Sequence, residues 1–426
     1  MINSRYKTLA RQLDSENALA VFRDRFNFPE SLNGLDPVYL CGNSLGLQPK
    51  AAIDYVNEVQ DAWRRYAVRG HFHGERPWTR YHRLATAGLA ALTGAEDREV
   101  IAMNALTVNL HLLLSAFYRP TPKRHKILIE SAAFPSDRFA VESQLRAHGN
   151  SPAEALIEWP LAAQSRRLEL DDLENILEQH GNEIAIILVP GVQYYSGEVL
   201  PMRDICTLAH EHGCLVGLDL AHAIGNIPLQ LHDWGADFAA WCSYKYLNAG
   251  PGAVAGAFVH SRHLDARLDG RLLGWWGNDE SSRFQMGKEF AAAPGMEAWQ
   301  LSNPPILALA PLLASLDLFA EAGLDALFAK SRELTGFLAT LLQSELPNDI
   351  RVLTPADACG SQLSLTVCNP ELDPKAFFAS LEALNVIVDW REPDVIRAAP
   401  APLYNSYGDV AEFVSRLKQA VATATG

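Results

Sequence analysis

The sequence predicts an α/β fold whose large sheet is mainly parallel, and three stretches in the middle of the chain indicate it. Residues 184–189 and 214–219 are continuous apolar runs, as expected of strands that helices cover on both faces. Residues 201–212 between them have the spacing of an amphipathic helix, which Gly213 stops. A strand, a helix and a second strand in this order form a parallel unit, and such sheets gather ligands at the carboxyl ends of their strands.

Length and charge restrict the class of protein. The 426 residues suffice for two domains with large cores, and a chain with 48% hydrophobic and 20% charged residues is typical of an ordered globular protein. A formal net charge of −14 disfavours nucleic acid or an anionic membrane as the main partner. No apolar run approaches the roughly 18–20 residues of a membrane span, and no signal segment opens the chain, so we expect a cytoplasmic protein.

Possible metal ligands and thiols are dispersed. The six cysteines include no C-x-x-C pair, which fits neither a disulfide framework nor a zinc site and favours a reducing compartment. His71 and His73 have no third ligand nearby, so we expect no metal there. Their loop, residues 69–78, is more plausible as a loop that contacts a substrate.

Three parts are expected along the chain. Residues 1–35 form a helical arm, residues 36–305 a large α/β domain and residues 306–426 a small α+β domain. Two prolines end the segment 301–305 and precede a long apolar helix over 306–322, which places the domain change there. The remainder alternates expected helices and strands. The helices are 325–346, 374–383 and 409–422, and the strands are 362–367, 386–390 and 395–399.

Several turns of the large domain have two interpretations. Gly42 and Gly46 punctuate the turn that follows a short strand near residue 39, which suits either a tight turn or a loop against a ligand. Thr107 stands where a helix should be capped, and a helix start with a hydroxyl also suits a phosphate. After a strand at 126–129, Ser136 or Asp137 suits either a plain helix cap or a site.

Lys245 is the most informative residue. It lies between two apolar runs, residues 238–241 and 253–259, where an ammonium group would lose hydration. Desolvation lowers the pKa of an amine and makes it a Schiff-base nucleophile, although a lysine can also extend out of a strand end to water. Asp219 ends a buried strand 26 residues earlier, as either a site residue or the cap of the next helix.

Two features come later in the chain. Trp275 and Trp276 form a glycine-flanked aromatic pair, which is unusual for a loop that covers nothing. Arg397 lies on a strand among apolar neighbours, and a buried guanidinium requires a carboxylate. That carboxylate can belong either to a substrate or to an internal salt bridge.

Taken together, these residues match the requirements of pyridoxal phosphate. A strand-end acid keeps the pyridine nitrogen protonated, a lysine forms the Schiff base, a helix start with hydroxyl groups binds the phosphate, and an aromatic ring stacks on the cofactor. Asp219, Lys245, Thr107 and Phe134 are the residues of these types.

From about residue 40 to residue 407 the chain resembles the kynureninases, which are fold-type-I pyridoxal phosphate enzymes. The matching blocks are residues 42–46, 103–109, 134–137, 219–222, 243–248, 301–305 and 402–406. The resemblance implies that Lys245 is the Schiff-base lysine and that Asp219 contacts the pyridine nitrogen, with Asp137 and His222 close by. It also implies that Tyr244 relays a proton.

The same resemblance implies the other contacts. Phe134 stacks on the ring, and the phosphate side is formed by Leu106, Thr107, Ser136 and Tyr244. Trp275 and Asn303 reach the cofactor across the interface of a homodimer. Arg397 binds the substrate carboxylate, and Ser44, His71 and Asn303 surround the aromatic ring of the substrate.

The implied reaction is hydrolytic Cβ–Cγ cleavage of L-kynurenine or 3-hydroxy-L-kynurenine, in tryptophan catabolism. The products are anthranilate or 3-hydroxyanthranilate and L-alanine. His71 and Asn303 favour the 3-hydroxy substrate. Two positions depart from the family pattern: Asn278 replaces a usual histidine, and Pro190 stands where a small hydroxyl residue is common.

Two alternative functions use the same fold. A cysteine desulfurase or selenocysteine lyase needs a nucleophilic cysteine on a mobile loop, and Cys359 is the only candidate. It runs directly into an expected strand, so we interpret it as structural. A catalytically silent scaffold is the other alternative, but it would have little reason to keep Lys245, Asp219 and Arg397 together.

Overall fold

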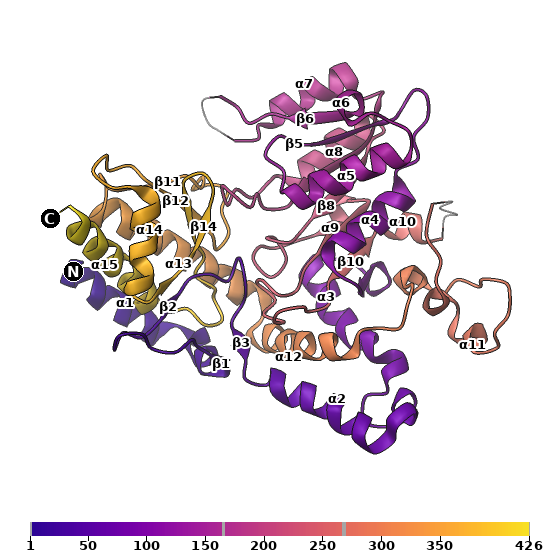
Figure 1. Cartoon of the computed structure of the whole chain (residues 1–426), viewed down its shortest axis with the longest axis horizontal. Helices are drawn as coiled ribbons and strands as arrows, with labels where there is room; N and C mark the ends of the chain where they lie inside the picture. The colour runs from indigo at the N-terminus through magenta and orange to yellow at the C-terminus, as the bar shows by residue number, and fades with distance from the viewer. Residues whose placement is uncertain (1, 164–166, 266–269, 426) are drawn as a thin grey trace.

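The computed structural model describes residues 2–163, 167–265 and 270–425. Figure 1 shows two bodies, with the large sheet at the right and a smaller sheet-and-helix body at the left, which carries both chain ends. The large sheet has seven strands. Their order is β4 (Val100–Ala102), β10 (Gly256–Val259), β9 (Phe238–Trp241), β8 (Leu215–Asp219), β7 (Ile184–Pro190), β5 (Lys126–Glu130) and β6 (Leu156–Trp159).

The predicted parallel arrangement is confirmed over most of this sheet. Strands β9, β8, β7, β5 and β6 run parallel to one another, and only β10 pairs antiparallel, with β4 and β9. Side chains of a strand alternate between its two faces. Ile186 and Leu188 join the core on one face, whereas Ile187 and Val189 join the core on the other. Both faces are buried, which explains the uninterrupted apolar run.

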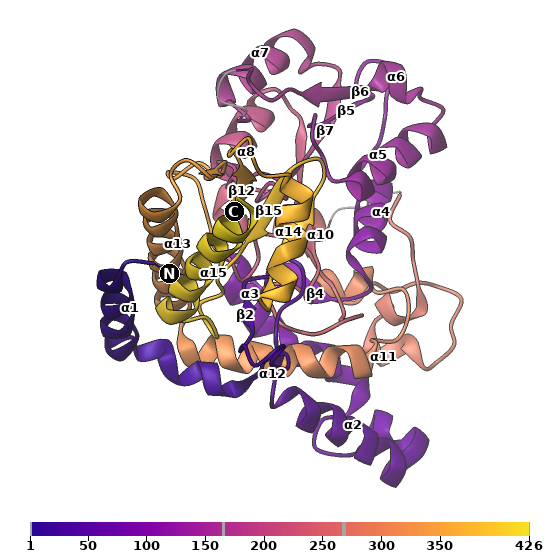
Figure 2. The ribbon, with the colours of Figure 1, turned by 60° about the vertical axis from the view of Figure 1, so that its left-hand side comes forward.

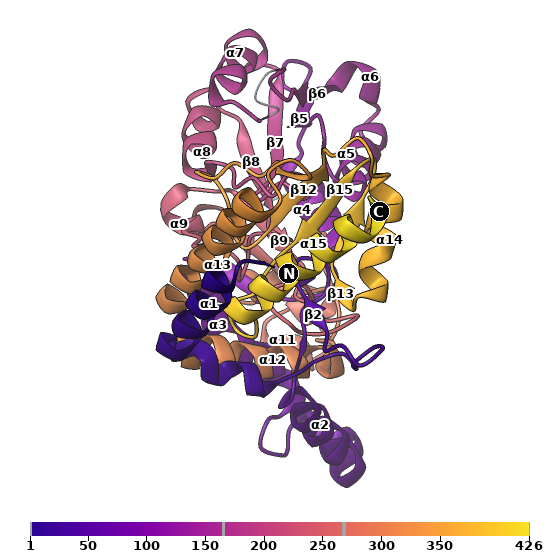
Figure 3. The ribbon, with the colours of Figure 1, turned by 90° about the vertical axis from the view of Figure 1, so that its left-hand side faces the viewer.

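Helices cover both faces of the large sheet. Helices α4 (Leu106–Phe117) and α5 (Pro135–Ala147) pack together on one face, and α7 (Leu170–His180) and α8 (Met202–Glu211) lie on the other. Helix α2 (Ala52–Tyr66) extends away from this body in Figure 3 and packs along α12 (Ile306–Ala322). The shorter helical segments are η2 (Ala67–His71), η3 (Trp78–Ala85), α3 (Thr86–Thr93), η4 (Asp97–Glu99), α6 (Pro152–Ala155), α9 (Leu231–Trp234), α10 (Ser261–Leu264), η5 (Trp275–Gly277), α11 (Glu280–Arg283) and η6 (Gly295–Trp299).

The smaller body contains an antiparallel sheet in the order β11 (Ile350–Val352), β12 (Leu363–Val367), β15 (Val395–Ala398) and β14 (Asp389–Arg391). Its helices are α13 (Leu324–Glu345), α14 (Pro374–Ala383) and α15 (Tyr407–Ala424). The strand expected over 386–390 is divided, because β13 (Val386–Ile387) pairs with β2 (Val38–Tyr39) while β14 pairs with β15. The sequence did not indicate β11, a short strand at the sheet edge.

Both ends of the chain build the core of the smaller body. Helix α1 (Ser4–Glu16) packs against α15, and Figure 2 shows α1 beside α13 and α15. Ala10, Val38 and Leu40 share one apolar core with residues of α13 and α15. Segments η1 (Ala18–Arg25), β1 (Phe26–Asn27) and β3 (Gln48–Pro49) follow α1. The boundaries at 35 and 305 stay a prediction.

The long apolar helix at 306–322 is confirmed as α12. Gly323, with φ of 77°, forms the corner between α12 and α13, which are bent by 86°. A side chain would strain this backbone conformation, whereas glycine tolerates it. Within the described part of the chain, no single helix is long and apolar enough to cross a membrane, and only this bent pair passes that test together.

Candidate active site

A cavity of about 210 Å³ opens at the carboxyl ends of β5, β7 and β8 and beside the loop after β9. This is where ligands of parallel sheets are expected. Its lining comes from Ala105, Leu106, Thr107, Glu130, Phe134, Ser136, Asp137, Pro190, Val192, Tyr194, Asp219, Ala221, His222, Tyr244 and Lys245. The structure therefore brings together residues that are far apart in the sequence.

Lys245 lies on the short loop after β9, and its Nζ is 2.9 Å from His222 Nε2. Burial lowers the pKa of the Lys245 amine, with a further contribution from the positive charges of Arg397 and Arg391. Burial also lowers the pKa of His222 well below its usual range, and its Nδ1 has no hydrogen-bond partner among the described residues. The cavity thus holds an amine and an imidazole whose pKa values are both lowered by burial.

Asp219 and Asp137 form a pair of buried carboxyl groups joined by a hydrogen bond. Asp219 Oδ1 also accepts a hydrogen bond from the amide of Ala221 at 2.6 Å. Burial raises the pKa of both groups, and their mutual repulsion raises that of Asp137 further. Asp137 Oδ1 is buried and has no partner within the described ranges. The pair fits a cationic N–H group, which would relieve both effects.

The opposite end of the cavity is formed by two helix starts. Helix α4 begins at Leu106 with Ala105 as its N-cap, so Thr107 lies in the first turn and the expected capping role is wrong. Helix α5 begins after Phe134, which places Ser136 in its first turn. Thr107 Oγ1 and Ser136 Oγ are 2.8 Å apart. First-turn amides and two hydroxyl groups form a suitable phosphate site.

Phe134 is 44% exposed although it is a large aromatic residue. Its ring meets that of Tyr194 edge-on at 5.2 Å, at the wall of the cavity. Together with the acid pair, the lysine and the two helix starts, this aromatic fits pyridoxal phosphate. The partnerless atoms Asp137 Oδ1 and His222 Nδ1 support that fit, because buried polar atoms without partners are rare in proteins.

The loop that contains Ser44 packs against the lysine loop. The amide of Gly46 donates a hydrogen bond to the carbonyl oxygen of Tyr244 at 2.9 Å. A Cβ atom at Gly46 would lie 2.4 Å from the Lys245 carbonyl oxygen. Glycine is therefore required here for close backbone approach to the lysine loop, and the choice between a tight turn and a loop against a ligand stays open.

Arg397 is fully buried and does not line the cavity. Its Nε donates to Asp389 Oδ1 at 2.6 Å, one amino group donates to Asp389 Oδ2, and the other donates to the Tyr194 carbonyl oxygen at 2.8 Å. The internal salt bridge is therefore present. Three of its five N–H groups have these partners, so the structure leaves the substrate interpretation open.

The other predicted site residues lie outside the cavity lining. Trp275 is 46% exposed and Asn303 is also exposed. His71 packs edge-on against Trp78 at 5.3 Å, and Ser44 is half-buried. On this chain none of the four side chains lines the lysine cavity, although the loop of Ser44 packs beside it.

Comparisons with known proteins agree with this geometry. A family model described as the kynureninase C-terminal domain matches residues 327–417. The kynureninase of Xanthomonas campestris pv. campestris (strain B100) is 51% identical over 411 residues, which cover 96% of each chain. That of Myxococcus xanthus (strain DK1622) is 50% identical over 414 residues, which cover 97% of this chain and 96% of the relative. This chain belongs to the kynureninase family.

Solved structures with 19% identity show the fold. A complex of the cystine C-S lyase C-DES with cysteine persulfide has a TM-score of 0.76 and covers 90% of this chain and 97% of its own. The cysteine desulfurase CsdA from Escherichia coli has a TM-score of 0.74 and covers 95% of this chain and 98% of its own. A C-DES variant carries glycine covalently linked to its PLP cofactor. The predicted fold-type-I architecture is confirmed.

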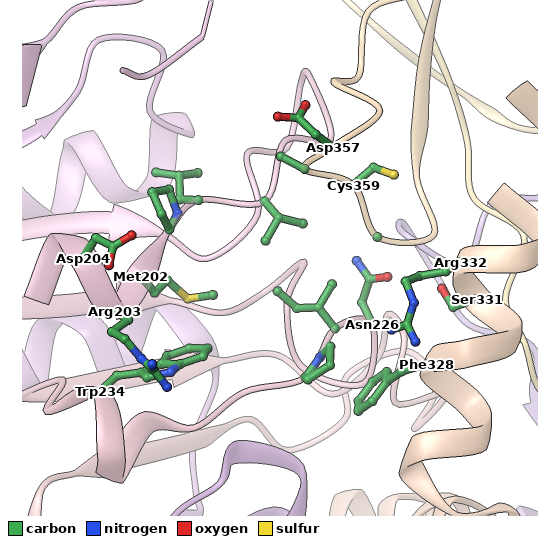
Figure 4. Close-up of a pocket in the computed structure, with 17 residues that line it drawn as sticks. Met202, Arg203, Asp204, Asn226, Trp234, Phe328, Ser331, Arg332, Asp357 and Cys359 are labelled. Carbon is green, nitrogen blue, oxygen red and sulfur yellow. The ribbon is translucent and has the colours of Figure 1, made fainter. Parts of the chain in front are cut away.

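In this kynureninase-family chain, Cys359 does not line the lysine cavity. It lies with Arg203, Asn226 and Arg332 in a second cavity of about 540 Å³, between α8 and α13 (Figure 4). Its thiol lies 3.7 Å from the Ala356 carbonyl oxygen, and burial raises its pKa. A raised pKa disfavours the thiolate, which supports the structural interpretation.

Sequence reasoning missed Glu130 and Tyr194 as lining residues. Glu130 ends an apolar strand, which is the same signal that identified Asp219. It is buried, and burial raises the pKa of its carboxyl group to about 8. Pro190 lies between Glu130 and Asp219 at the end of the sheet and offers no hydroxyl group.

At the other departure from the family pattern, Asn278 accepts a hydrogen bond from the amide of Ala291 at 2.7 Å, so its side chain serves a local loop contact.

Glu99, His232 and His260 form a group of possible metal ligands outside this cavity. Glu99 accepts hydrogen bonds from the amides of Glu96 and Ser261, and His232 Nδ1 lies 2.9 Å from it. His260 Nδ1 accepts from the amide of the second following residue. Hydrogen bonds that join η4 to α10 account for this arrangement.

Proposed function

We propose that the chain cleaves the Cβ–Cγ bond of L-kynurenine or 3-hydroxy-L-kynurenine with pyridoxal phosphate, and releases the aromatic acid and L-alanine. The observation that carries this proposal is the convergence of Lys245, His222 and the Asp219–Asp137 pair in one cavity of a kynureninase-family chain. When bound, pyridoxal phosphate supplies an electron sink for the charge that develops on the substrate.

Four groups would hold the cofactor. The carboxyl pair Asp219–Asp137 keeps a proton on the pyridine nitrogen, and the starts of α4 and α5 bind the phosphate through amides, Thr107 and Ser136. Phe134 covers one face of the ring. These roles use the burial and the hydrogen bonds described above.

Lys245 has the properties of both a nucleophile and a base. Its lowered pKa increases the fraction of neutral amine, which can attach the cofactor and then remove the proton from the substrate Cα. Burial raises the pKa of Tyr244, so its phenol keeps a proton that it can donate. Water adds to the γ-carbonyl carbon of the substrate, and the Cβ–Cγ bond then breaks.

We also propose a homodimer with a shared site in the cytoplasm. Trp275 and Asn303 are exposed on this chain and would serve the cavity of a second copy. Arg397 would bind the substrate carboxylate, with Ser44, His71 and Asn303 near the aromatic ring. The six cysteines are all unpaired, which suits a reducing compartment.

Turnover of the two candidate substrates tests the proposal. The purified protein, loaded with pyridoxal phosphate, should release anthranilate from kynurenine and 3-hydroxyanthranilate from 3-hydroxykynurenine, with no sulfide from cysteine. Failure with both substrates, or sulfide release at a comparable rate, would reject the assignment.

We expect a higher kcat/KM for 3-hydroxykynurenine. An imidazole and an amide can hydrogen-bond the extra ring hydroxyl, and leaving such groups unpaired costs about 1–3 kcal/mol, or roughly ten- to a hundredfold. His71→Ala should then reduce kcat/KM mainly for the 3-hydroxy substrate. An equal reduction for both substrates would show that His71 does not recognise the hydroxyl.

A further inference from the structure

Two arginines share one aspartate on the small sheet. Asp389 and Arg391 lie on β14, and Arg397 lies opposite Asp389 on β15. Arg397 donates to both carboxylate oxygens of Asp389, and an amino group of Arg391 lies 3.4 Å from Asp389 Oδ2. The cluster thus contains two guanidinium groups and one carboxylate.

The charge count matters if Arg397 binds a substrate carboxylate. Arg397 and Asp389 alone form a neutral pair, and a second carboxylate brought to that pair would meet the repulsion of Asp389. With Arg391 included, the cluster carries one positive charge in excess. A substrate carboxylate then completes the charge balance in a site where Arg397 is fully buried.

Arg391 also has hydrogen-bonding capacity that the chain does not use. Its Nε is buried and has no partner among the described residues. Its amino groups make only long contacts, 3.4 Å to Asp389 Oδ2 and 3.3 Å to the Trp390 carbonyl oxygen, among the described residues. The neighbouring acids are engaged elsewhere, because Glu392 pairs with Lys375 at 2.6 Å and Asp394 accepts a hydrogen bond from a tyrosine.

The positive charges of this arginine cluster act electrostatically on residues of the lysine cavity. The positive charges of Arg397 and Arg391 both contribute to the lowered pKa values of Lys245 and His222, after the larger effect of burial. The carbonyl oxygen of Tyr194, which lines the cavity, accepts a hydrogen bond from Arg397. The arginine pair and the reacting lysine therefore belong to one electrostatic environment.

We propose that Arg391 is a positioning residue for the carboxylate of amino-acid substrates. It balances the charge of Asp389, so that the positive charge of Arg397 can attract the substrate carboxylate. This inference rests on the proposed function in one respect, since it takes Arg397 as the carboxylate site.

Binding of the product L-alanine to the cofactor-loaded protein tests this role, followed by the change in visible absorbance. Arg391→Gln should lower the affinity for L-alanine about tenfold, as expected for the loss of one partly screened charge. It should also raise the KM for kynurenine about tenfold, while kcat stays within about threefold of the wild-type value. Ethylamine, which lacks the carboxylate, should bind as it does to the wild type. Arg391→Lys keeps the charge and should restore most of the affinity.

Two controls separate charge from structure. Arg351→Gln removes an exposed arginine at the opposite edge of the same sheet. It should leave the affinities for L-alanine and ethylamine unchanged. In an Asp389→Asn background, the effect of Arg391→Gln on L-alanine should shrink, because no carboxylate remains to be balanced.

Three results would overturn the proposal. They are an unchanged affinity of Arg391→Gln for L-alanine, an equal loss of affinity for L-alanine and for ethylamine, and an Arg391→Lys variant that binds L-alanine as weakly as Arg391→Gln. If the wild type fails to cleave kynurenine, the proposed function fails. The L-alanine titration would still decide the role of Arg391.

Discussion

The charge state of Glu130 can be tested directly by measuring stability at several pH values. It lies buried at the end of β5 beside Asp137 and Asp219, and its Oε2 has no partner in the part of the chain that the structure describes. Burial is the main reason why the pKa of its carboxyl group rises from the usual 4.5 to about 8; the hydrogen bond with Gln193 opposes this rise, and Asp219 and Glu198 add smaller upward contributions.

This shift predicts how the stability of the cofactor-free protein depends on pH. Between pH 4.5 and pH 8 the folded protein keeps the Glu130 proton while the unfolded chain loses it, so this residue makes the free energy of unfolding fall as pH rises. Glu130→Gln cannot ionise and should become progressively more stable than the wild type across this window, by a few kcal/mol at its upper end. Denaturant unfolding at several pH values measures the difference.

The control is Glu174→Gln, on the exposed surface of α7. It should run parallel to the wild type at every pH. A stability difference between Glu130→Gln and the wild type that stays constant from pH 4.5 to pH 8 would contradict the account of Glu130.

Single residues also show where sequence reasoning reached its limit. Lys245 and Asp219 could be identified because a charged residue beside a buried strand is unusual. Glu130 gave the same signal and was overlooked. Arg397 was left with two interpretations because its partner, Asp389, lies on another strand, and pairing between strands is set by tertiary structure.

At the scale of elements, the lysine loop is held by a second loop. Gly46 approaches this loop so closely that an added Cβ would lie 2.2 Å from Asn248 Oδ1 and 2.4 Å from the Lys245 carbonyl oxygen. Because the second contact is with backbone, one of the two loops would have to move.

Gly46→Ala should therefore destabilise the protein by about 1–3 kcal/mol and weaken cofactor binding. Thermal unfolding and a cofactor titration measure the two effects. Gly336→Ala is the matched control, since an added Cβ there meets nothing within 4 Å on α13 and alanine favours the helix. A Gly46→Ala protein as stable as the control would show that the close approach is not required.

Periodicity predicted the elements better than their boundaries and partners. The buried strands β7 and β8 and the helix α12 were predictable because their sequences are strongly apolar. The start of α4 was placed wrongly at Thr107, since Ala105 occupies the N-cap without any side-chain hydrogen bond. Strand β13 was merged with β14, because pairing with the distant β2 leaves no local signal.

At the scale of the whole molecule, a side chain of the first helix, α1, caps the start of the last helix, α15. Asp14 of α1 accepts hydrogen bonds from the amides of Tyr407 and Gly408, at 2.8 and 2.9 Å, where α15 begins. A carboxylate satisfies the free amides of a helix start and complements its dipole. This contact links the two chain ends across the core that they share.

Asp14→Ala should lower the free energy of unfolding by about 1–2 kcal/mol, because two amides lose their partner. Thermal or denaturant unfolding measures the loss, while kcat and KM should stay at wild-type values because the lysine cavity is in the other body. Asp24→Ala serves as the control at an exposed position of η1. An Asp14→Ala protein with wild-type stability would show that this contact does not fasten α15.

Covalent attachment of the cofactor to Lys245 tests the central claim most directly. Pyridoxal phosphate should be added to the purified protein, the Schiff base reduced with borohydride, and the modified peptide identified by mass spectrometry. We expect a phosphopyridoxyl group on Lys245 of the wild type. The Lys245→Ala variant should show neither that modification nor the visible absorbance of lysine-bound cofactor. Specific labelling of another lysine, or no labelling of the wild type, would contradict it.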